Sequence, residues 1–80
     1  MARSFIVDLN NIEDLRNFVN EVSHSISSDV DATYGRQNID AKSLLGLITI
    51  ASHPIEISIN SDNPDEIAAF EKICEQYEVK

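Results

Sequence analysis

Few side chains in this sequence have the chemistry of a nucleophile or a metal ligand. The candidates are two histidines, His24 and His53, the single cysteine Cys74, and Ser43, which directly precedes an apolar run. The histidines lack the short spacing and the cysteine or carboxylate companions of a metal site. We expect each histidine to lie on the surface or in a loop, and Cys74 to be a small core residue. The sequence therefore indicates no metal site and no cofactor.

Ser43 is the polar residue whose position is most informative. It follows Lys42 and stands where a short helix is expected to begin, and serine is a preferred N-cap residue. A phosphate on a serine at that position would be favoured by the helix dipole and the free backbone N–H groups. The apolar residues that follow are too many for one narrow buried stripe. Candidates for a protein-interaction surface are therefore Leu44, Leu45, Leu47 and Ile48, and the alternative is that the following loop buries them.

Four strands are indicated by the alternation of apolar and polar residues. The alternation covers residues 4–9, 29–34, 36–41 and 55–60, and the last of these has isoleucine at every second position. Gly35 stands between the second and third strands, where a tight turn needs a flexible backbone. The sequence therefore predicts a hairpin in the middle of the chain.

Helices are predicted after the first, third and fourth strands. The first begins after Asn10 or Asn11, either of which can act as N-cap. Its apolar stripe is expected to be Ile12, Leu15, Val19, Val22 and Ile26. The second follows Ser43 and ends before Pro54. The third begins after Asn63, with Glu66 in the position of a capping box, and its stripe is Ile67, Phe70, Ile73, Cys74 and Tyr77.

The resulting order, β-α-β-β-α-β-α, predicts an α+β protein in which one helical layer covers an antiparallel sheet. Eighty residues suit one domain, so residues 1–80 are expected to fold together. A formal charge of −8 opposes binding to nucleic acid and to anionic membranes. The sequence has no apolar stretch of membrane-spanning length, and its first residues contain no apolar run long enough for a signal peptide, so we expect none. One cysteine permits no intrachain disulfide. We therefore expect a cytoplasmic protein with protein partners.

The segment 41–47, Ala-Lys-Ser-Leu-Leu-Gly-Leu, resembles the regulatory-serine motif of the HPr family, small carriers of the bacterial sugar phosphotransferase system. The order of elements over nearly the whole chain is also that of the family. The resemblance implies an open-faced two-layer sandwich with strand order 1-4-2-3 and three helices on one face. It also implies that Ser43 is a candidate for regulatory phosphorylation.

The family carries phosphate on a histidine at the start of its first helix. Aligning the apolar pair at 18–19 puts Asn11 at that position, and a shift of one residue puts Ile12 there. Neither side chain has the nucleophilic ring nitrogen that a phosphocarrier needs. Glu13 and Asp14 replace the arginine and proline of the family motif, and their charges would repel a phosphate. The resemblance therefore implies a variant without the phosphocarrier histidine.

Three functions from different classes stay open. The first is a regulatory or protein-interaction module, not an enzyme, with Ser43 as its switch and a serine kinase or a regulator of sugar uptake as its partner. The second is a phosphocarrier that uses an atypical site. The third is a small enzyme or ligand-binding domain on the same scaffold, which no nucleophile-base pair, phosphate loop or metal motif supports. The first is the interpretation that the sequence favours.

Overall fold

The computed structural model describes residues 3–79 and has the element order that the sequence predicts. Its four strands form one antiparallel sheet in the order β1-β4-β2-β3. The elements in chain order are β1 (Ser4–Val7), α1 (Ile12–Ser25), β2 (Asp29–Tyr34), β3 (Gln37–Asp40), α2 (Leu44–Ile48), β4 (Ile55–Asn60) and α3 (Pro64–Glu75). The predicted fold class and strand order are therefore confirmed.

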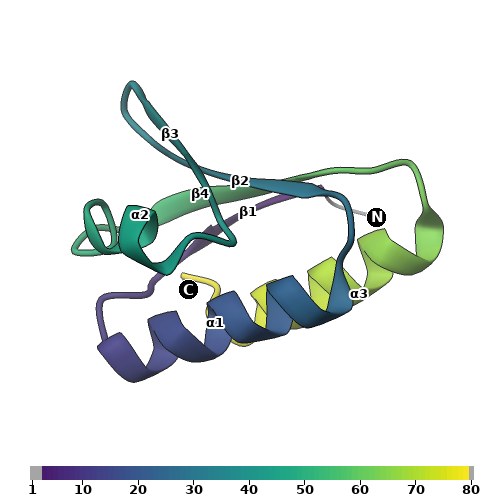
Figure 1. Cartoon of the computed structure of the whole chain (residues 1–80), viewed down its shortest axis with the longest axis horizontal. Coiled ribbons are helices and arrows are strands. Elements are labelled where there is room, and N and C mark those ends of the chain that lie inside the picture. The colour runs from purple at the N-terminus through teal and green to yellow at the C-terminus, as the bar shows by residue number, and fades with distance from the viewer. Residues whose placement is uncertain (1–2, 80) are drawn as a thin grey trace.

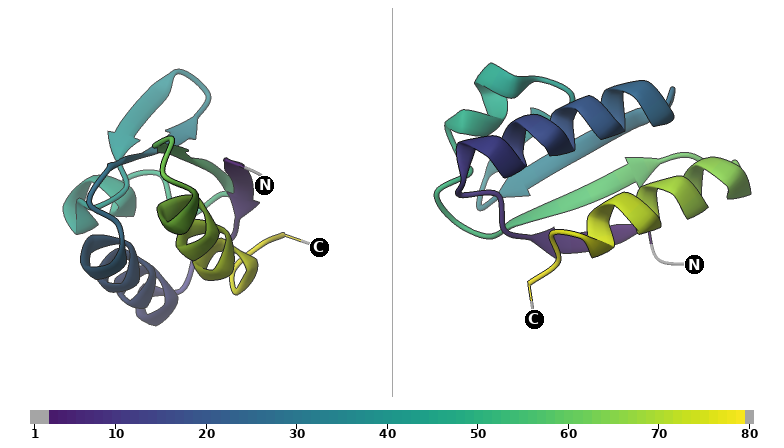
Figure 2. Two further views of the ribbon diagram at one scale, coloured as in Figure 1. Left: turned by 90° about the vertical axis from the view of Figure 1, so that its right-hand side faces the viewer. Right: turned by 90° about the horizontal axis from the view of Figure 1, so that it is seen from below.

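The molecule has two layers. Figures 1 and 2 show α1 and α3 side by side across one face of the sheet, with α2 at one end of the same layer. The central strand β4 pairs with both β1 and β2, and its Ile57 is the register partner of Phe5 on one side and Ala32 on the other. Within residues 3–79 no helix covers the opposite face of the sheet, which makes the sandwich open-faced.

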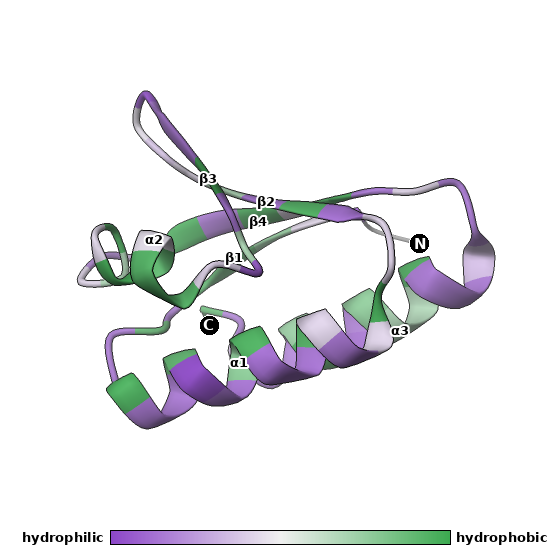
Figure 3. Ribbon diagram, in the orientation of Figure 1, coloured by the Kyte–Doolittle hydropathy of each residue, from purple (hydrophilic) through white to green (hydrophobic). Residues whose placement is uncertain are grey.

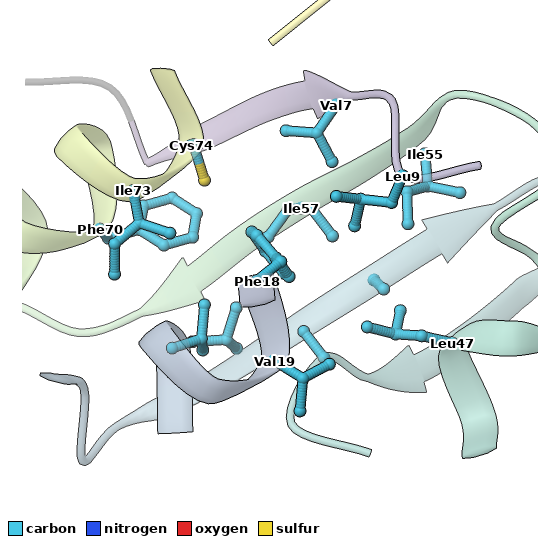
Figure 4. Packing of buried hydrophobic residues seen from close by; sticks show 14 of the residues in the cluster. Val7, Leu9, Phe18, Val19, Leu47, Ile55, Ile57, Phe70, Ile73 and Cys74 are labelled. Carbon is cyan, nitrogen blue, oxygen red and sulfur yellow. The ribbon is translucent and has the colours of Figure 1, made fainter. Parts of the chain in front are cut away.

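The core lies between the sheet and the two long helices. Every second residue of β4 points into it, and Ile55, Ile57 and Ile59 are all buried. Figure 4 shows Ile57 beside Phe18 of α1, and Phe70 of α3 lies on the same side of the sheet; both phenylalanines are fully buried. Figure 3 shows apolar and polar residues interspersed along the strands and helices, as the alternating and helical periodicities require.

Two details of the first helix differ from the expected stripe. Ile12 was expected in the buried stripe, but its side chain is 56% exposed, because the first turn of α1 extends beyond the end of the sheet. Phe18 was not in that stripe, although it is completely buried. The buried face of α1 is broad enough to hold both Phe18 and the adjacent Val19, because α1 lies over the sheet and also contacts α2 and α3.

Of the two hydrogen bonds in the predicted capping box of α3, one forms and the other does not. Asn63 is the N-cap, and its side chain accepts from the N–H of Asp65, as expected. The N–H of Asn63, however, donates to the hydroxyl of Ser61 and not to Glu66. The carboxylate of Glu66 is engaged instead by the serines of the loop between α1 and β2, which is distant in sequence.

Candidate functional site

Ser43 occupies the N-cap of α2, as its position in the sequence predicts. Its hydroxyl oxygen accepts a hydrogen bond from the N–H of Gly46 at 3.2 Å, and its own N–H donates to the carbonyl of Asp40 at 3.0 Å. The carboxylate of Asp40 also accepts from the N–H of Lys42 at 2.9 Å. Ser43 is half-buried, so its hydroxyl is held in a fixed place at the mouth of the helix and stays partly accessible.

Gly46 allows the helix and strand β3 to approach each other closely. A Cβ atom at this position would lie 2.6 Å from Cγ2 of Ile39 and 3.2 Å from the hydroxyl oxygen of Ser43. Real Cβ atoms do not come so close to a neighbouring carbon, so a side chain here would displace the neighbouring atoms. The glycine that weakens intrinsic helix propensity is therefore required by packing.

The apolar residues of α2 divide between the core and the surface. Leu47 is fully buried and belongs to the core, so it was wrongly included among the candidates for partner contact. Leu44 is half-buried against the core, whereas Leu45 and Ile48 are 81% and 48% exposed. With five residues the helix makes little more than one turn, so it can turn only part of its apolar surface inward. The surface candidates are Leu44, Leu45 and Ile48.

A shallow groove of about 190 Å³ lies between the start of α1 and the end of α2. Its apolar lining consists of Leu9, Ile12, Leu15, Ile48 and Ala51, and Asn10 and Ser52 add polar atoms. Two segments far apart in the sequence, residues 9–15 and 48–52, form it, which is why sequence patterns single out Ile12 and Ile48 but not the groove. The exposed side chains of Ile12 and Ile48 thus lie on one continuous surface.

Asn11 is the N-cap of α1. Its side-chain oxygen accepts hydrogen bonds from the N–H groups of Glu13 at 2.8 Å and Asp14 at 3.4 Å. These are two of the free backbone donors that would otherwise be available to an anion at this helix end. Asn11 and the adjacent Ile12 are both exposed, and the two acidic side chains of the first turn are also exposed.

Neither histidine lies at this helix start. His24 is in the last turn of α1, roughly 20 Å from Asn11 by the rise of the helix, and its Nδ1 atom lies 2.7 Å from the carbonyl oxygen of Asn20. His53 is in the loop between α2 and β4, where its ring stacks on Tyr34. Both are exposed, as predicted. No pattern in the sequence indicates the stack with Tyr34.

Cys74 is a core residue, as predicted. It is fully buried on α3, and burial, with a smaller contribution from the charge of Glu78, raises the pKa of its thiol to about 12. The thiolate, which is the reactive form, is therefore strongly disfavoured. Among residues 3–79, the His, Cys, Asp and Glu side chains form no group of three or more that could hold a metal ion. None of the helices within those residues has the length and apolar character of a membrane span.

The fold and the two helix starts together define a class of protein. An open-faced β-α-β-β-α-β-α sandwich with strand order 1-4-2-3 carries a serine-capped short helix beside the N-terminus of its first helix. A family model described as the PTS HPr component phosphorylation site matches residues 16–78. This chain therefore belongs to the HPr family of the phosphotransferase system. A search among curated proteins found no match.

The family match begins at Arg16, after the start of α1. Ser43 and α2 lie within the matched residues, whereas Asn11 and Ile12 lie outside them. The assignment of Asn11 or Ile12 to the phosphocarrier position thus stays a prediction from the sequence.

Proposed function

We propose that this chain is a non-carrier member of the HPr family that regulates a process linked to sugar uptake by binding protein partners. Ser43 is its phosphorylation switch, and the exposed residues of α2 with the adjacent groove are its contact surface. Membership of the HPr family supports the link to sugar uptake. The loss of carrier activity and the regulatory role are inferred from the residues at the two helix starts.

The observation that carries the proposal is the N-cap of α1. A phosphocarrier needs a nucleophilic ring nitrogen and free donors for the transferred anion. Asn11 supplies an amide instead, and its oxygen already accepts from the N–H groups of Glu13 and Asp14. The carboxylates of the same two residues add negative charge at the place where the phosphate would arrive. Both effects oppose phosphoryl transfer to this end of α1.

The surroundings of Ser43 support its role as phosphoacceptor. Its side chain is partly accessible, and the N–H of Gly46 already donates to its oxygen. A phosphate would offer three further acceptor oxygens to that donor, so the cap could persist after modification. It would also add a charge of about −1.5 to −2 two residues before Leu45, the most exposed large apolar side chain among residues 3–79. The same surface would then present a different charge to a partner.

The absence of carrier activity can be tested with phosphoenolpyruvate and the first enzyme of the phosphotransferase system. We expect no acid-labile phosphate on the purified protein, and a family member with the histidine provides the positive control. The Asn11→His variant should recover little, because Glu13 and Asp14 stay in place. Acid-labile label on the wild-type chain would refute the proposal and support a carrier with an atypical site.

The switch can be tested with an HPr-type serine kinase and ATP. We expect acid-stable label on the wild-type chain and none on Ser43→Ala. Ser25→Ala removes a different exposed serine and serves as the matched control, which should be labelled like the wild type. Equal label on Ser43→Ala would place the site elsewhere, and no label on either chain would leave Ser43 a structural cap.

A further inference from the structure

The rings of Tyr34 and His53 form a stacked pair between two loops. Their centroids lie 4.7 Å apart and their planes differ by 5°. Tyr34 is the last residue of β2, immediately before the turn at Gly35, and His53 lies in the loop between α2 and β4. The stack therefore joins the tip of the β2–β3 hairpin to the loop that follows α2, and both are found at the same end of the molecule in Figure 1.

Few other specific contacts hold the loop between α2 and β4. Before it, the N–H of Ile50 donates to the carbonyl of Leu47 at 3.0 Å, and after it Ile55 pairs with Val7 of β1. Within residues 3–79, the side chains of residues 51–54 make no hydrogen bond and no ion pair. Ala51 is buried in the core, so among residues 52–54 the ring stack of His53 is the specific side-chain contact that can hold the loop.

The same loop forms one wall of the groove. Ala51 and Ser52, the two residues before His53, line the groove opposite Ile12 and Leu15 of α1. We propose that the Tyr34–His53 stack is a latch that holds this wall in place, so that the hairpin tip controls the shape of the groove. The inference rests on the proposed function only in treating the groove as a contact surface. The effect of the ring stack on the loop does not depend on any partner.

Two pairs of variants separate the ring stack from other roles of these residues. Tyr34→Leu and His53→Gln each remove one ring, whereas Tyr34→Phe and His53→Tyr keep a ring at the same place. Backbone order parameters from nitrogen-15 relaxation then report on residues 51–53, with β4 as the internal reference. For the loop we expect order parameters of about 0.85 in the wild type and in the two ring-keeping variants. In the two ring-removing variants we expect loop order parameters below about 0.6. The reference strand should stay unchanged.

A double variant tests whether both residues act through one contact. Tyr34→Leu with His53→Gln should loosen the loop no more than either single change, because each already removes the whole stack. Loop order parameters that are unchanged in both ring-removing variants would overturn the proposal. A further loss in the double variant would also overturn it, as would a loose loop in Tyr34→Phe. Because no partner or kinase is used, these outcomes do not depend on whether Ser43 is phosphorylated.

Discussion

The carboxylate of Glu66 in the first turn of α3 accepts a hydrogen bond from the hydroxyl of Ser28, which lies 38 residues earlier in the chain. The same carboxylate accepts from both the N–H and the hydroxyl of Ser27 at 2.7 Å, and from the hydroxyl of Ser61 at 3.1 Å. Glu66 therefore links the loop between α1 and β2 to the start of α3. All of these donors favour the ionised form of the carboxylate.

This linkage predicts a specific loss of stability in acid. The hydrogen bonds from Ser28 and then Ser27 lower the pKa of Glu66 from its ordinary 4.5 to about 2 in the folded protein. Because the folded pKa is below the unfolded one, the contribution to stability is complete above pH 4.5 and is lost as the pH falls toward 2. The Glu66→Gln variant should have a lower free energy of unfolding than the wild type at pH 7. Between pH 4.5 and pH 2 its free energy of unfolding should fall by less than that of the wild type.

Chemical denaturation of both proteins at several pH values in this range would measure the effect. Glu75→Gln removes one negative charge from the exposed end of the same helix and is the matched control. The prediction fails if Glu66→Gln and the wild type lose stability in parallel as the pH is lowered.

A second prediction separates the core residue of α2 from its surface residue. Leu47 is fully buried, whereas Leu45 is 81% exposed. Leu47→Ala should therefore lower the free energy of unfolding by about 2 to 5 kcal/mol, because it leaves a cavity. Leu45→Ala should change it by no more than about 0.5 kcal/mol. Urea denaturation followed by circular dichroism would measure both, and similar losses in the two variants would contradict the assignment of faces.

The order and type of the elements could be predicted from the sequence because each depends on local signals, either periodicity or capping and terminating residues. The alternation of Ile55, Ile57 and Ile59 and the capping residues Asn11 and Asn63 are signals of this kind, and the structure confirms them. Family resemblance supplied the strand order, which local patterns do not determine.

The features that the sequence did not predict depend on contacts between distant segments. Ser27 and Ser28 lie almost 40 residues from Glu66, so no local pattern indicated that they would engage the capping-box glutamate. The groove and the Tyr34–His53 stack likewise join segments that are adjacent only in the folded chain. Leu47 and Leu45 could not be distinguished beforehand, since a helix of five residues is too short to show which face is buried.

A third prediction concerns Gly46. An alanine here would gain about 1 kcal/mol in helix propensity. Its Cβ atom would, however, lie 2.6 Å from Cγ2 of Ile39, and such overpacking typically costs about 1 to 3 kcal/mol. We expect Gly46→Ala to be destabilised overall in urea denaturation. Adding Ile39→Leu, which removes the Cγ2 methyl group of the β-branched side chain at the point of contact, should recover part of the loss. Gly46→Ala as stable as the wild type would show that the steric cost against β3 is no larger than the gain in helix propensity.

The last prediction tests the cap that Ser43 provides. Replacing the hydroxyl by hydrogen in Ser43→Ala leaves the N–H of Gly46 without its side-chain acceptor, so the free energy of unfolding should fall by about 1 kcal/mol. Asparagine is an equally good N-cap residue, and Ser43→Asn should therefore stay close to the wild type while offering no hydroxyl to a kinase. Urea denaturation would measure the first difference, and labelling with kinase and ATP would measure the second. If Ser43→Asn is as stable as the wild type but takes up no label, the capping role is separated from the proposed phosphorylation. Equal stability of Ser43→Ala and the wild type would show instead that the hydrogen bond to Gly46 contributes little, because water replaces it at this partly accessible helix end.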